Sequence, residues 1–436
     1  MLLLSEAHAA EQGGGRGVSA PRIPALGLGG QNVGTKTPTK GPTAKPRDGL
    51  EARMRFPSDE RTPELGDIAR ELVVAAGAAP GAAVALGVRG TAGFRVGVGT
   101  AGARSAADRR PLDPGAIFDL ASVTKPFVAT TAARLAERNE LALDVPLADL
   151  LDEARQSPSA EATLELLFSH RAGLDAHRSL FAPLRARRPF DRRSALLEAA
   201  RARRSDCTGP IPASGFAPLY SDLGYLLAGA ALERALGCPL ERLIEREVLT
   251  PLALDIHAAR GWFERDPDFA RRAVPTEDVS WRGGRLLATV HDENSWALAG
   301  HGVAGAAGLF GTVGAVARFG CAVLDALAGR ADAWLSAASA RWLVAERPGG
   351  TLRSGFDGKA SVGSSAGERC GPRTFGHLGF TGTSLWCDPD AGVVLVLLTN
   401  RVNPSRDKLE IRAVRPQVND AMMALAGRWR GDATGS

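Results

Sequence analysis

The chain has 436 residues, of which 44% are hydrophobic, 23% charged and 6% aromatic, a globular composition that allows a large core or two to three domains. The net charge of +5 is small for this length, so charge alone gives no case for nucleic acid as a partner. The five cysteines are widely spaced and include no CxxC pair, which supports neither a disulfide framework nor a structural zinc site.

The first 62 residues are predicted to form a disordered tail. They include Gly13-Gly14-Gly15 and a run rich in Thr, Lys and Pro over residues 35–42, with few large apolar residues. Such a segment cannot bury enough surface to offset the entropy lost on ordering. A basic anchoring arm is the alternative interpretation of this segment.

The chain start bears on the compartment. The apolar run after Met1 is too short for a signal peptide and lacks a basic segment before it. We therefore expect a cytoplasmic protein, or a periplasmic one if the start codon is misassigned. Two long stretches lack charged residues, 72–88 and 294–317, but the first contains Gly and Pro and the second contains His301 and frequent Gly. No membrane span is expected from them.

The ordered part is predicted to begin with a helix. Thr62-Pro63-Glu64 suits a helix start, and apolar residues follow at helical spacing. Two strands are predicted at 82–88 and 94–98. The region from 116 to 260 is mostly helical, with candidate helices at 126–139, 160–168, 192–204, 223–236 and 240–248.

Strands return near the end of the chain. Two β-rich runs, 377–386 and 393–399, are joined by a hairpin loop, and an amphipathic helix follows at about 414–425. Strands at both ends predict one sheet with a helical insertion. We expect a sheet part made of 63–115 and 305–427, a helical part at 116–304, and a second tail at 428–436.

The first candidate for chemistry is Ser122-Val123-Thr124-Lys125. On a helix, Ser122 and Lys125 lie one turn apart on the same face. A neutral Lys amine can accept the Ser proton, and free N–H groups at a helix start favour a developing oxyanion. Alone, the pattern also fits a solvated Ser and Lys. Lys125 is one of few lysines in the chain and an apolar helix follows directly, which indicates a half-buried pair.

The second candidate is Tyr220-Ser221-Asp222, which lies just before a predicted helix. The chain has only two Tyr, and Tyr220 is one of them. Tyr220 could relay protons to a leaving group, and Asp222 could orient Lys125. The alternative is that Asp222 is merely the N-cap of the helix.

The third candidate is Phe375-Gly376-His377-Leu378-Gly379-Phe380, which runs into a strand. Glycines allow close approach of the backbone to a ligand and leave N–H groups free at a strand edge. His377 could hydrogen-bond the substrate or the Tyr–Lys pair. The alternative is a bulged edge strand with an exposed His.

The order and separation of these motifs resemble the serine hydrolases of the penicillin-binding protein and β-lactamase superfamily, most closely the class C-like branch with its esterases and D-amino-acid peptidases. Its motifs are S-x-x-K, then Y-x-N or Y-x-D, then K-T-G or H-x-G, matched here by Ser122–Lys125, Tyr220–Asp222 and His377–Gly379. Residues 166–174 are similar to the family's LLSHTSGL loop, and 290–294, 307–312 and 398–402 look like one branch of it. The resemblance covers about 63 to 427.

The resemblance implies an α/β fold of the mixed β-lactamase/transpeptidase type, with an antiparallel sheet flanked by terminal helices, an inserted helical domain and a cleft between them. It implies that Ser122 is acylated, that Lys125 is its base, and that Tyr220 relays protons and assists deacylation. The N–H groups of Ser122 and Phe380 would form the oxyanion hole. Asp222, His377, Gly379 and Phe380 would contact the substrate, and no cofactor is implied.

Two positions depart from the commoner family residues. Asp222 replaces Asn, which exchanges a possible donor for a charge. His377 replaces Lys, which removes a permanent cation for a substrate carboxylate. The charge of His377 is expected to change between about pH 5 and 8 unless the environment shifts its pKa. Both changes disfavour an efficient β-lactamase, but they leave the case for acyl transfer intact.

Three further motif matches are set aside. Gly363–Gly367 fits G-x-S-x-G, but no helix start follows it and no Asp lies between Ser365 and His377, the only later His. Ser405–Lys408 repeats S-x-x-K in a polar stretch typical of a surface loop. Gly300–Gly305 fits G-x-G-x-x-G outside a βαβ unit, so a Gly-rich wall near the cleft is expected in place of a dinucleotide site.

Two charged groups are also set aside. His291, Asp292 and Glu293 are consecutive, and adjacent residues rarely converge on one ion, so no metal is expected. The arginines between 178 and 204 are interspersed with acids and are typical of solvated helix faces.

We therefore expect a serine hydrolase that forms an acyl-enzyme on Ser122 and hydrolyses a small ester, a D-amino-acid peptide or a β-lactam. The alternative is a non-catalytic protein that keeps the cleft, binds a ligand and has lost turnover. Chemically competent residues at all three motif positions favour the enzyme.

Overall fold

The computed structural model describes residues 59–434, so most of the predicted N-terminal tail lies outside the described residues. Two predicted boundaries differ from the structure. Strand β1 (Glu60–Arg61) pairs in parallel with β3 (Gly93–Gly102), which places order before Pro63. Helix α14 (Ile411–Thr434) extends through most of the predicted C-terminal tail. Its buried Trp429 packs in the sheet core with Val418 and Leu425, which explains why the helix continues.

One sheet holds strands from both ends of the chain. Its seven strands have the order β1-β3-β2-β12-β11-β10-β9, and every pairing except β1–β3 is antiparallel. The central pair joins β2 (Gly81–Gly90) to β12 (Val393–Thr399), with Leu86 opposite Leu395. The prediction of one sheet built from both termini is therefore confirmed. The remaining strands are β9 (Asp357–Gly358), β10 (Phe375–Leu378) and β11 (Ser384–Asp388).

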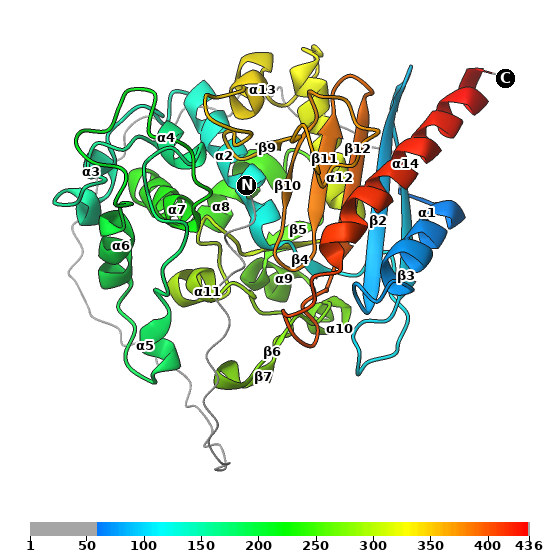
Figure 1. Ribbon diagram of the computed structural model, residues 1–436, viewed down its shortest axis with the longest axis horizontal. Helices are drawn as coiled ribbons and strands as arrows, with labels where there is room; N and C mark the ends of the chain where they lie inside the picture. Colours follow the sequence, from blue (N-terminus) through cyan, green and yellow to red (C-terminus); the bar gives the residue numbers. More distant parts are fainter. Residues whose placement is uncertain (1–58, 435–436) are drawn as a thin grey trace, which may run out of the picture. The chain divides into compact units, whose positions relative to one another are not determined.

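Helices cover both faces of the sheet, and successive residues of a central strand pack into the two cores in turn. Val84 and Leu395 belong to the core under α1 (Pro63–Ile68), the π-helical turn η2 (Ala69–Val74) and α14. Their neighbours Ala85 and Val394 belong to the larger core that includes α12 (Val313–Leu327). Figure 1 shows α1 and α14 on one face and α12 on the other. All of β12 is buried, which fits its uninterrupted apolar sequence.

The predicted β run at 377–386 is two strands and not one. β10 ends at Leu378, residues 379–383 form a turn, and β11 begins at Ser384, with His377 opposite Leu385. The turn is stabilised by a hydrogen bond of 2.8 Å from the Gly379 N–H to the Thr383 carbonyl. The prediction failed because Phe380, Thr381 and Thr383 in the turn are residue types that are common in strands.

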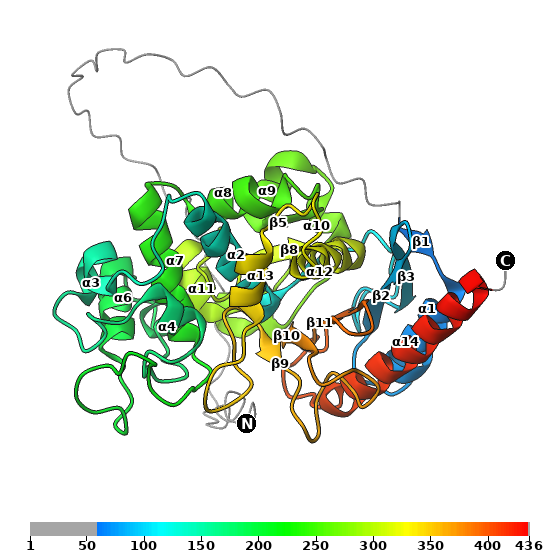
Figure 2. The ribbon, with the colours of Figure 1, turned by 90° about the horizontal axis from the view of Figure 1, so that it is seen from above.

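The helical part surrounds α2 (Thr124–Glu137), which begins beside the sheet. Phe127 of α2 stacks on Phe319 of α12, with ring centroids 4.0 Å apart. Figure 2 shows α3, α4, α6 and α7 gathered on the side of α2 away from α14. The helices of this region are α3 (Leu147–Leu150), η4 (Asp152–Ala154), α4 (Leu164–Phe168), α5 (Ala182–Arg185), α6 (Arg192–Arg201), α7 (Asp222–Leu236), α8 (Leu240–Ile244), η5 (Glu245–Leu249), α9 (Ala259–Arg265), α10 (Phe269–Arg272) and α11 (Glu293–Ala299).

Short elements complete the fold. A three-stranded sheet has the order β4 (Phe118–Asp119), β8 (Leu309–Gly311) and β5 (Ile256–Ala258). A small hairpin pairs β6 (Asp278–Val279) with β7 (Gly284–Arg285) around the turn η6 (Ser280–Arg282), and α13 (Ala337–Val344) packs near α12. Within residues 59–434, no helix combines the length and the apolar character that crossing a bilayer requires.

Candidate active site

Ser122 lies in a tight turn that leads into α2. The turn is the 3-10 helix η3 (Ala121–Val123), and Ala121 has a φ of 49°. This left-handed conformation costs a non-glycine residue about 1–2 kcal/mol. The buried Asp119 side chain stabilises it by accepting hydrogen bonds from the N–H groups of Ala121 (2.8 Å) and His291 (2.7 Å). The nucleophile candidate is therefore held on a strained turn, with its side chain partly accessible.

Lys125 joins the first two motifs. Its Nζ donates hydrogen bonds to Ser122 Oγ (2.8 Å) and to Asp222 Oδ1 (2.7 Å). The Lys125 side chain is fully buried, whereas 22% of the Asp222 side chain is exposed. A third hydrogen bond of 3.2 Å goes to the carbonyl of Ala306, in the loop after the Gly-rich stretch 300–305. Ala306 directly follows the stretch that was expected to form a Gly-rich wall near the cleft.

The charge of the Lys–Asp pair follows from its surroundings. Burial alone disfavours the Lys125 ammonium, but the Asp222 carboxylate and Tyr220 together outweigh burial and raise the Lys125 pKa above its ordinary value. Burial likewise disfavours the Asp222 carboxylate, and the Lys125 ammonium outweighs that effect and lowers the Asp222 pKa. The pair is therefore ionic at neutral pH.

Asp222 is the first residue of α7 and not its N-cap. The cap is Ser221, whose Oγ accepts a hydrogen bond of 3.4 Å from the Gly224 N–H. The alternative in which Asp222 merely caps the helix is therefore wrong. Capping by Ser221 leaves the Asp222 carboxylate available to Lys125.

Tyr220 is half-buried beside the Lys–Ser pair. Lys125 Nζ lies 4.9 Å from the centre of the Tyr220 ring. Burial raises the pKa of the Tyr220 hydroxyl to about 12, against the opposing effect of the Lys125 charge. The hydroxyl is therefore protonated at neutral pH and can donate a proton.

His377 is buried and neutral. Its side chain is only 5% exposed, and its ring centre lies 5.9 Å from that of Tyr220. Burial, reinforced by the Lys125 charge, lowers the His377 pKa to about 3. The alternative of an exposed His is therefore wrong, and the environment moves the charge change of His377 out of the range between pH 5 and 8. Nδ1 lies 2.7 Å from the Leu378 carbonyl, which places the proton on Nδ1 and leaves Nε2 as an acceptor.

The turn at 379–383 packs against the main chain that precedes Ser122. Thr381 and Thr383 each donate a side-chain hydrogen bond of 2.9 Å, to the carbonyls of Asp119 and Leu120 respectively. A Cβ at Gly379 would lie 2.7 Å from the Leu120 carbonyl oxygen. Gly379 is therefore required for this close backbone packing, and no approach of a ligand is needed to explain it.

Two backbone N–H groups at this contact have no protein acceptor. Within residues 59–434, the N–H groups of Ser122 and Phe380 donate to no other residue. They come from the two segments that pack together, and Ser122 also carries the nucleophile candidate. Such a pair of donors can stabilise a developing oxyanion.

His170, in the LLSHTSGL-like stretch, also lies at the site, although no role was predicted for it. Its Nδ1 accepts a hydrogen bond of 3.0 Å from the Ser221 N–H, and its ring centre lies 4.7 Å from that of Tyr220. Burial lowers the His170 pKa to about 3, so the ring is a neutral acceptor. The hydrogen bond to Ser221 and the ring contact with Tyr220 hold the Tyr220–Asp222 segment in place. The spacing of the stretch gave no sign of this contact.

The motifs that were set aside lie elsewhere in the chain. Ser405 donates its hydroxyl hydrogen bond to Asp407 (2.7 Å), and Ser365 lies in a loop between β9 and β10. His291 contacts Glu277 (2.8 Å). Among the described residues, no group of three or more His, Cys, Asp or Glu side chains could hold a metal ion.

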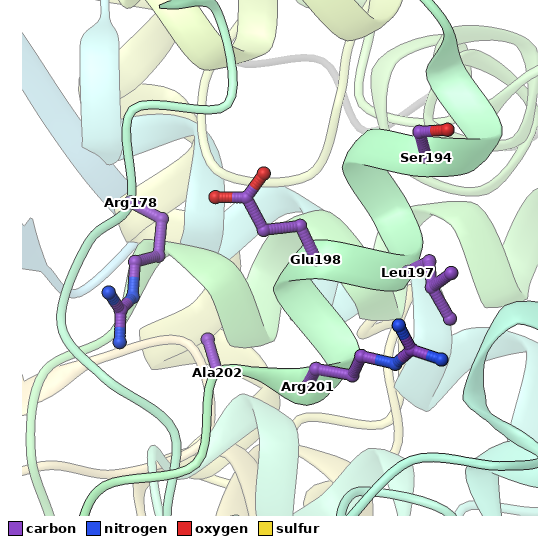
Figure 3. Close-up of a pocket in the computed structure, with 6 residues that line it drawn as sticks. All are labelled: Arg178, Ser194, Leu197, Glu198, Arg201 and Ala202. Atoms are coloured by element: carbon purple, nitrogen blue, oxygen red, sulfur yellow. The ribbon is translucent and has the colours of Figure 1, made fainter.

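The Arg-rich stretch forms no common anion site. A surface pocket of about 330 Å³ is lined by Arg178, Ser194, Leu197, Glu198, Arg201 and Ala202 (Figure 3). In Figure 3 the Arg201 side chain points away from Arg178, and the guanidinium of Arg178 pairs with Asp175. None of the Ser122, Lys125 or Tyr220 side chains lines this pocket.

Comparison with protein families assigns the class. A family model described as Beta-lactamase matches residues 69–419, and the chain belongs to this family. The family and the fold class that the sequence motifs implied are therefore confirmed.

Individual relatives are more distant. A putative D-alanyl-D-alanine carboxypeptidase of Escherichia coli (strain K12) is 29% identical over 197 residues, which are 42% of this chain and 45% of the relative. The chain thus spans less than half the length of the curated relatives it matches.

Solved structures share the fold. EstCE1, a hydrolase with promiscuous acyltransferase activity, matches with a TM-score of 0.62 and 20% identity over 83% of this chain and 98% of its own. A class C beta lactamase from Rhodobacter sphaeroides matches with a TM-score of 0.60 and 18% identity over 83% of this chain and 99% of its own.

Proposed function

We propose that the protein is a serine hydrolase that forms an acyl-enzyme on Ser122 and hydrolyses an ester or an amide. The observation that carries the proposal is the hydrogen bond of 2.8 Å between Ser122 Oγ and Lys125 Nζ, at a helix start beside two free N–H groups. Membership of the beta-lactamase family and the likeness to EstCE1 also support it.

In the proposed reaction, Ser122 Oγ attacks the carbon of the substrate carbonyl and gives its proton to Lys125. The N–H groups of Ser122 and Phe380 stabilise the negative oxygen of the tetrahedral intermediate. Tyr220, protonated at neutral pH, donates a proton to the leaving group. Water then attacks the acyl group, and the proton movements repeat in reverse.

A small neutral ester is the substrate class that the site chemistry favours. The third motif holds a neutral His377 where much of the family has Lys, so this position supplies no cation for a substrate carboxylate. The carbonyl chemistry itself needs no such cation. D-alanyl peptides and β-lactams remain in the test because the relatives include a putative D-alanyl-D-alanine carboxypeptidase and a class C beta lactamase.

A panel of chromogenic esters, D-alanyl peptides and cephalosporins tests the substrate class. We expect turnover of the esters to exceed that of the other two groups. A fluorophosphonate tests the nucleophile, with mass spectrometry locating the adduct on Ser122. An adduct on Ser365 or Ser405 would contradict the proposal.

The alternative function is ligand binding without turnover. It predicts that a substrate binds in the cleft but that neither an acyl-enzyme nor a fluorophosphonate adduct forms. Ser122→Ala is the matched control, because it removes the nucleophile at a partly exposed position.

A further inference from the structure

Lys125 donates all of its available hydrogen bonds. An ammonium group carries three protons, and Lys125 Nζ has three acceptors, at Ser122 Oγ (2.8 Å), Asp222 Oδ1 (2.7 Å) and the Ala306 carbonyl (3.2 Å). In this arrangement Lys125 is a donor to Ser122. It cannot accept the Ser122 proton until its nitrogen has given one away.

Asp222 is the acceptor for that proton. The Ala306 carbonyl accepts hydrogen bonds but does not take up a proton near neutral pH. The Asp222 carboxylate is the other group in contact, at 2.7 Å, and it is an anion. An Asn at this position would make a hydrogen bond to Lys125 but could not take the proton.

The other titratable groups around the pair are hydrogen-bonded elsewhere or cannot take up a proton. The Tyr220 hydroxyl interacts with Lys125 and Ser122 but is already protonated, because its pKa is raised to about 12. Tyr225 donates its hydroxyl to the Phe168 carbonyl (2.8 Å), and His170 Nδ1 accepts from the Ser221 N–H. Asp292 caps α11 through a hydrogen bond of 2.7 Å from the Ser295 N–H. The remaining charged or titratable neighbours that influence the pair are His377 and His177.

We propose that Asp222 is the terminal acceptor of the Ser122 proton, reached through Lys125. This inference rests on the proposed function. As the Ser122 oxygen bonds to the substrate carbonyl carbon, its proton moves to Lys125 Nζ and a Lys125 proton moves to Asp222 Oδ1. The result is a protonated Asp222, a Lys125 ammonium and an alkoxide tetrahedral intermediate. When the carbonyl reforms, Tyr220 gives its proton to the departing alkoxide or amine and regains a proton from Asp222 through Lys125.

The inference makes a specific prediction about pH. In the active state of the pair, Lys125 is protonated and Asp222 is ionised. This state persists at pH values between the Asp222 pKa and the Lys125 pKa. The Asp222 pKa is lowered and the Lys125 pKa is raised, so kcat/KM of the wild type should not decline between about pH 8 and 5. On the acidic side, kcat/KM should fall only at a pH low enough to protonate Asp222, because a protonated Asp222 cannot accept another proton.

In Asp222→Asn, kcat/KM is expected to depend on pH on the acidic side. Without the anion, burial lowers the Lys125 pKa, and the neutral amine becomes the base. An acidic limb should then appear between about pH 7 and 9, below which kcat/KM falls about tenfold per pH unit. At pH 6 we expect a loss of about 10- to 1000-fold that is largely recovered at high pH.

The experiment compares kcat/KM from pH 5 to 10, with one neutral chromogenic ester, in the wild type, Asp222→Asn, Asp222→Glu and Asp292→Asn. Asp222→Glu keeps a carboxylate, so its kcat/KM should not decline between about pH 8 and 5. Asp292→Asn removes a nearby negative charge that does not touch Lys125, and its profile should match the wild type. Circular dichroism shows whether each variant is folded.

The outcomes separate this inference from the proposed function. If the wild type hydrolyses the ester and labels on Ser122, but the profile of Asp222→Asn superimposes on that of the wild type, Asp222 is not the proton acceptor. If Asp222→Asn fails to fold, an acidic limb in the wild type between pH 6 and 8 would equally overturn the inference. If the wild type neither turns over nor labels on Ser122, the proposed function itself fails.

Discussion

Arg415 Nη2 donates a hydrogen bond of 2.7 Å to the carbonyl of Gly379, thirty-six positions earlier in the chain. Arg415 is buried in α14 and also donates to the Thr383 carbonyl at 3.2 Å. Arg401 Nε donates to the carbonyl of Phe380 at 2.8 Å. Two buried guanidinium groups thus fix the carbonyls on either side of the Phe380 N–H, and they hold the peptide unit that carries this N–H in one orientation.

Arg415→Lys tests this arrangement. Lys keeps the positive charge, but it cannot reproduce the planar geometry of a guanidinium that reaches two carbonyls. Because an oxyanion donor is worth about 100-fold or more in kcat, we expect kcat to fall about 10- to 100-fold with little change in KM. Steady-state kinetics on a neutral ester measures both constants.

The control for Arg415→Lys is Arg428→Lys, which makes the same change at an exposed position of the same helix. It should keep the wild-type kcat. An equal loss in both variants, or a loss confined to KM, would show that Arg415 does not position the turn.

Lys125→Arg tests the proton path at its centre. Arg keeps the charge and can still pair with Asp222, but it does not lose a proton in a protein. The relay between Ser122 and Asp222 is then blocked, and we expect fluorophosphonate labelling to slow by about three orders of magnitude. Labelling within a few-fold of the wild-type rate, in a protein with an unchanged melting temperature, would show that Lys125 carries no proton.

His377 supplies a prediction about acid stability. Its pKa is about 3 in the folded protein and near 6.5 when unfolded, so falling pH protonates the unfolded state first. The stabilisation is fully present above pH 6.5 and is lost progressively toward pH 3. For this residue, the free energy of unfolding should drop by about 2 kcal/mol between pH 7 and 5.

The measurement is urea unfolding at pH 7 and pH 5 in the wild type and in His377→Gln. Gln does not titrate, so the difference between the two pH values should be smaller in the variant by about 2 kcal/mol. His170, which is also buried with a pKa of about 3, remains in both proteins and contributes equally. An identical pH dependence in both proteins would mean that His377 is not held neutral by the fold.

The sequence predicted one sheet built from both ends of the chain because strands leave a local pattern, and the resemblance carried by the ordered motifs implied the fold class. The apolar run of β12 is visible over a few residues, whereas helix α12 was not predicted. The roles of Arg401 and Arg415 were missed because a guanidinium that reaches a distant carbonyl leaves no periodic signal. The neutral state of His377 was missed for a related reason, since burial depends on the tertiary packing.

Gly379→Ala tests whether the contact between the turn and the Ser122 segment matters. A Cβ at this position would lie 1.9 Å from Thr383 Oγ1 and 2.7 Å from the Leu120 carbonyl oxygen, so the turn must move away from η3. That movement separates the N–H groups of Phe380 and Ser122, and we expect kcat to fall about 100-fold. Gly427→Ala is the control, because a Cβ on this helical residue meets nothing within 4 Å. It should keep full activity and raise the free energy of unfolding by up to about 1 kcal/mol. Wild-type kcat in Gly379→Ala would show that the two segments need not touch for catalysis.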